Sequence, residues 1–123
     1  MRAASRNDWD NKPLPEQRAT LKVERRFSEA EMGAIQQGFV PWEMGQKWFI
    51  YFEDNTLYMH RSWTGNCIYV AEFRKTGDDY EITRLLANRN PEQIKHMDDA
   101  EDVSFFLETL NGFFLRRVPP LRG

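Results

Sequence analysis

The feature that most constrains the fold is a dense run of aromatic side chains between residues 47 and 73. Eight of the seventeen aromatic residues of the chain fall within these 27 positions. Side chains alternate across a strand, so large apolar groups at successive positions must point to both faces of one sheet. On the first strand we expect Trp48, Ile50 and Phe52 to share one face and Phe49 and Tyr51 the other; on the next strand Leu57 and Met59 oppose Tyr58 and His60. A sheet with one wet face would alternate apolar with polar residues instead, so the second face needs a cover.

Turn residues divide this region and the residues that follow it into an antiparallel meander. The predicted strands cover residues 47–52, 56–62, 67–75 and 80–87, and the turns between them cover residues 53–55, 64–66 and 76–79. Period-2 alternation over residues 20–27 predicts one more strand with a buried face.

Two helices are predicted, one before and one after the meander. Ser28 and Glu31 have the spacing of a capping box, so the first helix begins after Ser28, and Gly38 marks its end. The second helix begins near residues 98–100 and continues at helical spacing through Phe114. The order strand, helix, four strands, helix predicts an α+β fold with both helices packed on one face of an antiparallel sheet of about five strands.

The length of 123 residues supports one compact domain and leaves little room for a second. Residues 1–18 are polar and are interrupted by Pro13 and Pro15, which fix φ and remove backbone donors. We therefore predict a flexible N-terminal arm over residues 1–18, for which Trp9 is a candidate anchor. Residues 19–123 would then form a single α+β domain.

Charge and cysteine content limit the partners and the compartment. Seventeen basic against nineteen acidic residues give a net charge of −2, so no global positive field recruits nucleic acid or an anionic membrane. Aromatic sheets stack single-stranded bases in some proteins, but the net acidity argues against nucleic acid as a partner. No apolar run is typical of a signal peptide or a membrane span, and the single Cys67 can form no internal disulfide. We therefore predict a cytoplasmic protein.

The candidate ligand-binding site is the end of the second meander strand and the turn that follows it. It combines aromatic rings, an imidazole, a guanidinium and hydroxyls, in the residues Tyr58, His60, Arg61, Ser62, Trp63 and Thr64. Such a group can bind a ring and an anion together, with Arg61 gripping the anion and Trp63 or Tyr58 stacking. The alternative is structural, with His60 as a hydrogen-bonded core residue and Arg61 stacked on Trp63 or paired with Glu53 or Glu72.

Signals for catalysis are weaker. His60 and Cys67 are candidates for a base and a thiolate nucleophile, but no third residue that would orient them is evident. The histidines at 60 and 96 and the scattered carboxylates form no metal-ligand spacing, and the acidic run at residues 98–102 is typical of a helix N-terminus. The dispersed glycines form no phosphate-binding motif. We therefore predict no metal and no cofactor.

Three short strings carry a resemblance to a known group of proteins. They run from Lys47 to Asp54, from Leu57 to Gly65 and from Cys67 to Tyr69, and the match covers about a fifth of the chain. This pattern resembles a small uncharacterised bacterial domain associated with ADP-ribosylglycohydrolase and macrodomain proteins. The resemblance implies an accessory module linked to ADP-ribose or nucleotide metabolism. It implies no catalytic role, because the chain lacks the acidic metal motifs and the length expected of a glycohydrolase.

These observations predict a non-catalytic, cytosolic binding or accessory module. Its aromatic sheet and the turn at residues 60–65 would recognise a small anionic, nucleotide-like ligand or a protein partner. One alternative is an interaction domain that forms a homodimer through the second sheet face. A further alternative is a small enzyme that uses Cys67 and His60.

Overall fold

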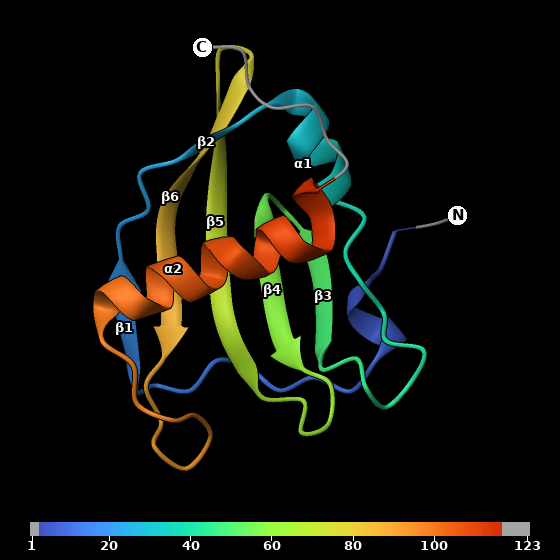
Figure 1. The fold of residues 1–123 in the computed structure, drawn as a ribbon, viewed down its shortest axis with the longest axis vertical. Coiled ribbons are helices and arrows are strands. Elements are labelled where there is room, and N and C mark those ends of the chain that lie inside the picture. Colours follow the sequence, from blue (N-terminus) through green and yellow to red (C-terminus); the bar gives the residue numbers. More distant parts are fainter. Residues whose placement is uncertain (1–2, 117–123) are drawn as a thin grey trace.

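The computed structural model describes residues 3–116 and shows an antiparallel sheet with helices on one side (Figure 1). The sheet has six strands in the order β1-β6-β5-β4-β3, and β2 also pairs with β6. The strands are β1 (Arg18–Leu21), β2 (Arg26–Phe27), β3 (Trp48–Glu53), β4 (Thr56–Arg61), β5 (Cys67–Thr76) and β6 (Asp79–Asn88). The helices are α1 (Glu29–Ile35) and α2 (Asp99–Leu110), with a 3₁₀ turn, η1 (Arg6–Asp8), and a π-helical segment, η2 (Asn111–Leu115). The predicted α+β fold is confirmed.

The meander over residues 48–88 follows from its turns. Asp54 and Asn55, which connect β3 and β4, have φ values of 52° and 60°. A two-residue turn with positive φ at both positions matches the twist of the flanking strands, and Asp and Asn tolerate this conformation better than most residues. Gly77, with φ of 63°, lies in the turn between β5 and β6. The four predicted strands are therefore present, with ends shifted by about one residue.

The strand predicted over residues 20–27 is two strands in the structure. Leu21 of β1 pairs with Leu85, whereas Arg26 of β2 pairs with Glu81. The four residues 22–25 therefore stand opposite the three residues 82–84. The one extra residue on the edge strand interrupts the ladder. On its other edge β6 has a register shift against β5, which leaves Thr83 outside the pairing. This break adds the sixth strand to the sheet.

Both helices begin where the sequence predicts, and both begin with a capping box, which was predicted only for the first. The Glu31 amide donates to Ser28 Oγ at 3.1 Å, and the Ser28 amide donates to Glu31 Oε1 at 2.9 Å. Asp98 and Glu101 make the same reciprocal pair at the start of α2. The α-helical geometry of α2 ends at Leu110, and the chain continues as the π-helical segment η2, which packs near α1. Both helices contribute to one core.

A buried polar link ties α2 to the sheet within that core. The hydroxyl of Tyr69 on β5 donates to Oδ1 of Asp102 on α2 at 2.6 Å, and Arg89 forms an ion pair with the same carboxylate. Tyr69 and Asp102 are fully buried. Because a buried carboxylate without partners is costly, these bonds favour one position of the helix over the strands.

Side chains alternate between the two sheet faces within each strand as predicted, and the structure shows which residues of neighbouring strands share a face. Trp48, Ile50, Leu57 and Met59 belong to the core that the helices cover, whereas Phe49 and Tyr51 belong to a second cluster on the other face, against which Tyr58 packs. The cover of that second face is the N-terminal segment, residues 3–17, which passes behind the strands in Figure 1. Ala4 packs in the cluster of Phe49, and Leu14 packs against the neighbouring cluster of Cys67, Val70 and Leu86.

Backbone hydrogen bonds hold this N-terminal segment near its start, in its middle and at its end, where the Arg89 amide donates to the Gln17 carbonyl. The Ala4 amide donates to the Gln37 carbonyl and the Lys12 amide donates to the Gly65 carbonyl, both at 2.8 Å. The flexibility predicted for the arm over residues 1–18 stays a prediction, as does its division from residues 19–123. Residues 1–2 and 117–123 lie outside the described part of the chain.

Candidate functional site

The structure distributes the six predicted site residues over both faces of the sheet and one end of it. Tyr58 stacks on Tyr51, with ring centroids 4.7 Å apart, and His60 is buried and stacks on the same ring. Arg61 lies on the opposite face, where its guanidinium carbon is 4.7 Å from the centroid of the Trp48 ring. Arg61 therefore stacks on an aromatic ring as the structural alternative expects, but the ring is that of Trp48, its partner across β3 and β4.

The other three predicted residues form the turn after β4. Ser62 Oγ donates to the Gln46 carbonyl at 2.8 Å, and Trp63 Nε1 donates to the Met44 carbonyl at 2.9 Å. Thr64 Oγ1 accepts a bond from the Asn66 amide at 3.2 Å, within the turn. These bonds join the turn to the loop between α1 and β3 and place Ser62 and Trp63 at the wall of a pocket.

This tryptophan pocket has a volume of about 580 Å³. Its lining consists of Trp9, Pro41, Trp42, Glu43, Met44, Gln46, Ser62 and Trp63. Trp42 is 75% exposed, Met44 77%, Trp63 69% and Trp9 37%, and these are four of the five large apolar side chains that are exposed within residues 3–116. Monomeric proteins rarely gather large apolar groups at the surface without a partner or ligand, so this pocket is the candidate functional site.

Hydrogen bonds orient the indole rings that line the pocket. Trp9 Nε1 donates to the Ser62 carbonyl at 2.8 Å, as Trp63 Nε1 does to that of Met44. The backbone amide of Trp42 donates to Gln46 Oε1 at 2.7 Å, and the Trp42 ring lies 5.5 Å from that of Phe39. With the N–H donors of Trp9 and Trp63 already paired, the π faces and apolar edges of these rings are what they offer a ligand.

The formal charge of the pocket lining is negative. Among the residues that line it, Glu43 alone has an ionisable side chain, and this carboxylate makes no ion pair with any residue in 3–116. A neighbouring pocket of about 610 Å³ shares Trp42, and its one charged lining residue is Asp8. Indole π faces carry negative potential too, so the arrangement favours a cation over an anion.

Most residues of this site were not predicted from the sequence as site residues. Ser62 and Trp63 are in the predicted set, but Trp9, Trp42, Glu43 and Met44 come from the N-terminal segment and the loop after α1. One signal was available, because Trp42 and Met44 lie between Pro41 and Gly45 in a stretch that no strand or helix pattern claims. Large apolar residues in such a loop have no place in a regular core face.

The catalytic alternative finds its two residues on neighbouring strands, but the thiol is held in its protonated form. His60 on β4 pairs in register with Cys67 on β5. Burial lowers the pKa of His60 to about 4 and raises the pKa of Cys67 to about 12. Both groups are therefore neutral near pH 7, and a buried neutral thiol is a poor nucleophile. The arrangement does not supply the thiolate that this chemistry requires.

Residues 3–116 contain no group of three or more His, Cys, Asp or Glu side chains that could hold a metal ion. None of the helices in this part of the chain is long and apolar enough to cross a membrane. The resemblance to domains of ADP-ribosylglycohydrolase and macrodomain proteins stays an expectation from the sequence. No family model, no curated protein and no solved structure matches the chain.

Proposed function

We propose that the protein is a non-catalytic binding module whose tryptophan pocket takes a small organic cation, such as an alkylated ammonium ion. The observation that carries this proposal is the convergence of Trp9, Trp42 and Trp63 on one pocket in which Glu43 is the only charged lining residue. The volume of about 580 Å³ lies within the range of pockets that bind small molecules.

The expected affinity is modest. A cation over an indole face contributes about 0.5–2 kcal/mol, depending on how far it is desolvated. An exposed ion pair with Glu43 adds up to about 1 kcal/mol. Contacts with two or three rings and one carboxylate therefore correspond to dissociation constants in the micromolar to millimolar range.

This proposal keeps the binding module predicted from the sequence and reverses the charge of its ligand. The anionic ligand depended on Arg61, which stacks on Trp48 and is not among the residues that line the pocket. An anion in the pocket would approach the Glu43 carboxylate without a compensating positive charge from its lining, which raises the free energy of the complex.

Choline titrated against the full chain, followed by tryptophan fluorescence and calorimetry, tests the proposal. Its uncharged carbon analogue, 3,3-dimethylbutan-1-ol, has nearly the same shape and should bind at least about tenfold more weakly, because it lacks the cation–π attraction. Trp42→Ala and Trp63→Ala should each weaken choline binding by about tenfold. Equal affinity for choline and the alcohol would show that charge plays no part and would contradict the proposal.

A matched pair of charge variants isolates the carboxylate. Glu43→Gln should weaken choline binding several-fold, whereas Glu92→Gln, at an exposed carboxylate outside this pocket, should leave it unchanged. A similar loss in both variants would point to a general effect of net charge. The folded state of each variant is checked by its thermal unfolding midpoint.

The homodimer predicted through the second sheet face stays an alternative. Ala4 and Leu14 pack on that face, so a dimer there would require the N-terminal segment to move away or to exchange between copies. Light scattering over a range of concentrations distinguishes this dimer from a monomeric module. The cytosolic location is also retained as a proposal, supported by the single buried Cys67, because small secreted domains depend on disulfides far more often than cytosolic ones.

A further inference from the structure

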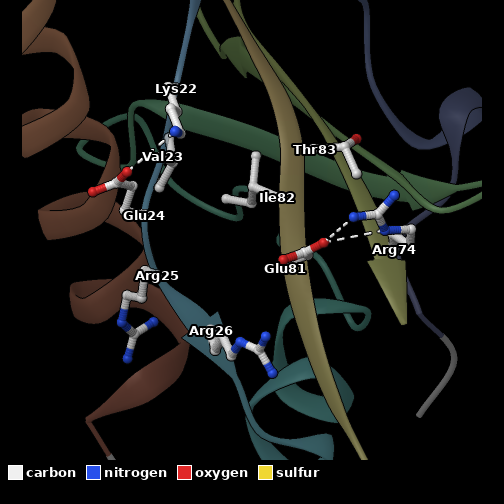
Figure 2. A pocket seen from close by; sticks show the side chains of 9 residues that line it. All are labelled: Lys22, Val23, Glu24, Arg25, Arg26, Arg74, Glu81, Ile82 and Thr83. Carbon is white, nitrogen blue, oxygen red and sulfur yellow. Dashed lines mark hydrogen bonds and ion pairs between the residues drawn. The ribbon is translucent and has the colours of Figure 1, made fainter. Parts of the chain in front are cut away.

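A second cavity, which we call the basic hollow, opens where the edge of the sheet breaks between β1 and β2 (Figure 2). Its volume is about 620 Å³, and it is lined by Lys22, Val23, Glu24, Arg25, Arg26, Arg74, Glu81, Ile82 and Thr83. The hollow shares no lining residue with the tryptophan pocket. Any ligand it holds is therefore independent of the proposed cation site.

The hollow exists because the ladder between the edge strands and β6 is interrupted. No backbone hydrogen bond joins residues 22–25 to residues 82–84 within the described chain. Figure 2 shows Val23 and Ile82 between the two strands, with Arg26 on one side and Arg74 beside Glu81 on the other. Val23 and Ile82 are buried and form an apolar floor. Backbone groups on this edge of β6 are left without partners from β1 or β2.

Positive charge is concentrated around this hollow. Four of its lining side chains are basic and two are acidic, which gives a local charge of +2 in a chain whose net charge is −2. A cavity lined by one excess sign focuses the field and attracts the opposite ion.

Part of this charge is committed to other contacts and part is available to a ligand. Arg25 donates to Glu31 at 3.0 Å, and Arg74 is bound to Glu81. The ion pair between Lys22 and Glu24 is 3.2 Å long and more than three-quarters exposed on both sides, so it contributes little and a ligand can replace it. The side chain of Arg26 makes no ion pair and no hydrogen bond within residues 3–116, although Arg74 and, to a lesser degree, Arg26 lower the pKa of the nearby Glu81 carboxylate.

We propose that the basic hollow binds a phosphate group, with the guanidinium of Arg26 as its main contact and Lys22 and Arg74 as further positive charges at its margin. The planar guanidinium fork matches the oxygen spacing of phosphate, and the excess of basic over acidic side chains at the hollow favours an anion. The shared chemistry is a phosphate dianion, which can come from inorganic phosphate or from a small phosphate monoester.

Titration of the full, isotopically labelled chain with inorganic phosphate at low ionic strength, followed by amide chemical shifts, tests this proposal. We expect saturable shifts at residues 22–26 and 82–83. A parallel titration with glycerol phosphate distinguishes the two sources, since tighter binding of the ester identifies a monoester as the ligand and tighter binding of phosphate identifies the free ion. Shifts spread over all basic surfaces without saturation would overturn the proposal.

Variants separate specific binding from general attraction. The double variant Lys22→Gln/Arg26→Gln should weaken phosphate binding by about tenfold or more, because it removes the charge-assisted hydrogen bond of Arg26 and the nearby positive charge of Lys22. Lys95→Gln, at an exposed lysine outside the hollow, serves as the matched control and should change the affinity little. An equal loss in this control would overturn the proposal. Trp63→Ala should leave phosphate binding intact.

Discussion

The indole Nε1 of Trp9 donates a hydrogen bond to the carbonyl oxygen of Ser62 at 2.8 Å. This bond joins the N-terminal segment to the turn after β4, and both residues line the tryptophan pocket. The segment that covers the second sheet face therefore also completes a wall of the proposed binding site.

Trp9→Phe removes this donor and keeps an aromatic ring. We expect choline binding to weaken several-fold, because one net hydrogen bond of about 1 kcal/mol no longer holds the segment in place. Amide hydrogen exchange should become faster at Ala4 and Lys12, whose amides bond to the body of the domain. Unchanged exchange at both amides would show that Trp9 does not hold the segment.

His60 should make stability depend on pH. Burial lowers its pKa in the folded state to about 4, from an ordinary value of 6.5. The unfolded chain therefore binds more protons between these values, so the free energy of unfolding falls as pH decreases from 6.5 toward 4, by up to about 3 kcal/mol. Urea unfolding at several pH values measures this slope. His60→Phe should flatten it and His96→Gln should not; an equal slope in the His60 variant would refute the assignment.

Tyr69→Phe tests the polar link between β5 and α2. The variant leaves Oδ1 of the buried Asp102 without its hydroxyl donor, and we expect the free energy of unfolding to fall by about 1–3 kcal/mol. Tyr80→Phe is the matched control, because the Tyr80 hydroxyl makes no hydrogen bond to another residue in 3–116. Denaturant unfolding of both variants gives the comparison, and equal stability of the two would contradict the role of the link.

Gly38 and Gly33 should respond to alanine in opposite directions. Gly38 has φ of +66°, and a Cβ there would lie 2.4 Å from the Ile50 carbonyl oxygen, so Gly38→Ala should destabilise the fold by more than about 1 kcal/mol. Gly33 lies in α1 with open space around its Cα, and Gly33→Ala should stabilise the fold by about 0.5–1 kcal/mol. Thermal unfolding measures both. Equal shifts in the two variants would contradict this account.

The thiol of Cys67 should be unreactive in the folded protein. Burial raises its pKa to about 12 and leaves it almost inaccessible to solvent, so an aromatic disulfide reagent at pH 8 should modify it only after denaturant is added. Rapid modification of the native chain would contradict this prediction and would support the alternative of an enzyme that uses Cys67 and His60.

Patterns within short stretches of sequence predicted the regular elements well. The meander, both helix starts and the division of side chains between the two faces follow from alternation, turn residues and capping, which act over a few neighbouring residues. The split of the predicted strand over residues 20–27 did not follow, because its cause lies in the register of β6, where Thr83 leaves the pairing.

The sequence by itself therefore determined that this chain forms an antiparallel sheet with two apolar faces, since alternation at successive positions leaves no other arrangement. Only the tertiary structure decided what covers the second face and where a ligand can bind. Ala4 and Leu14 supply the cover, and Trp9, Trp42 and Trp63 meet around one pocket although they are far apart along the chain. Contacts between distant segments depend on how complete elements pack, which local residue patterns do not encode.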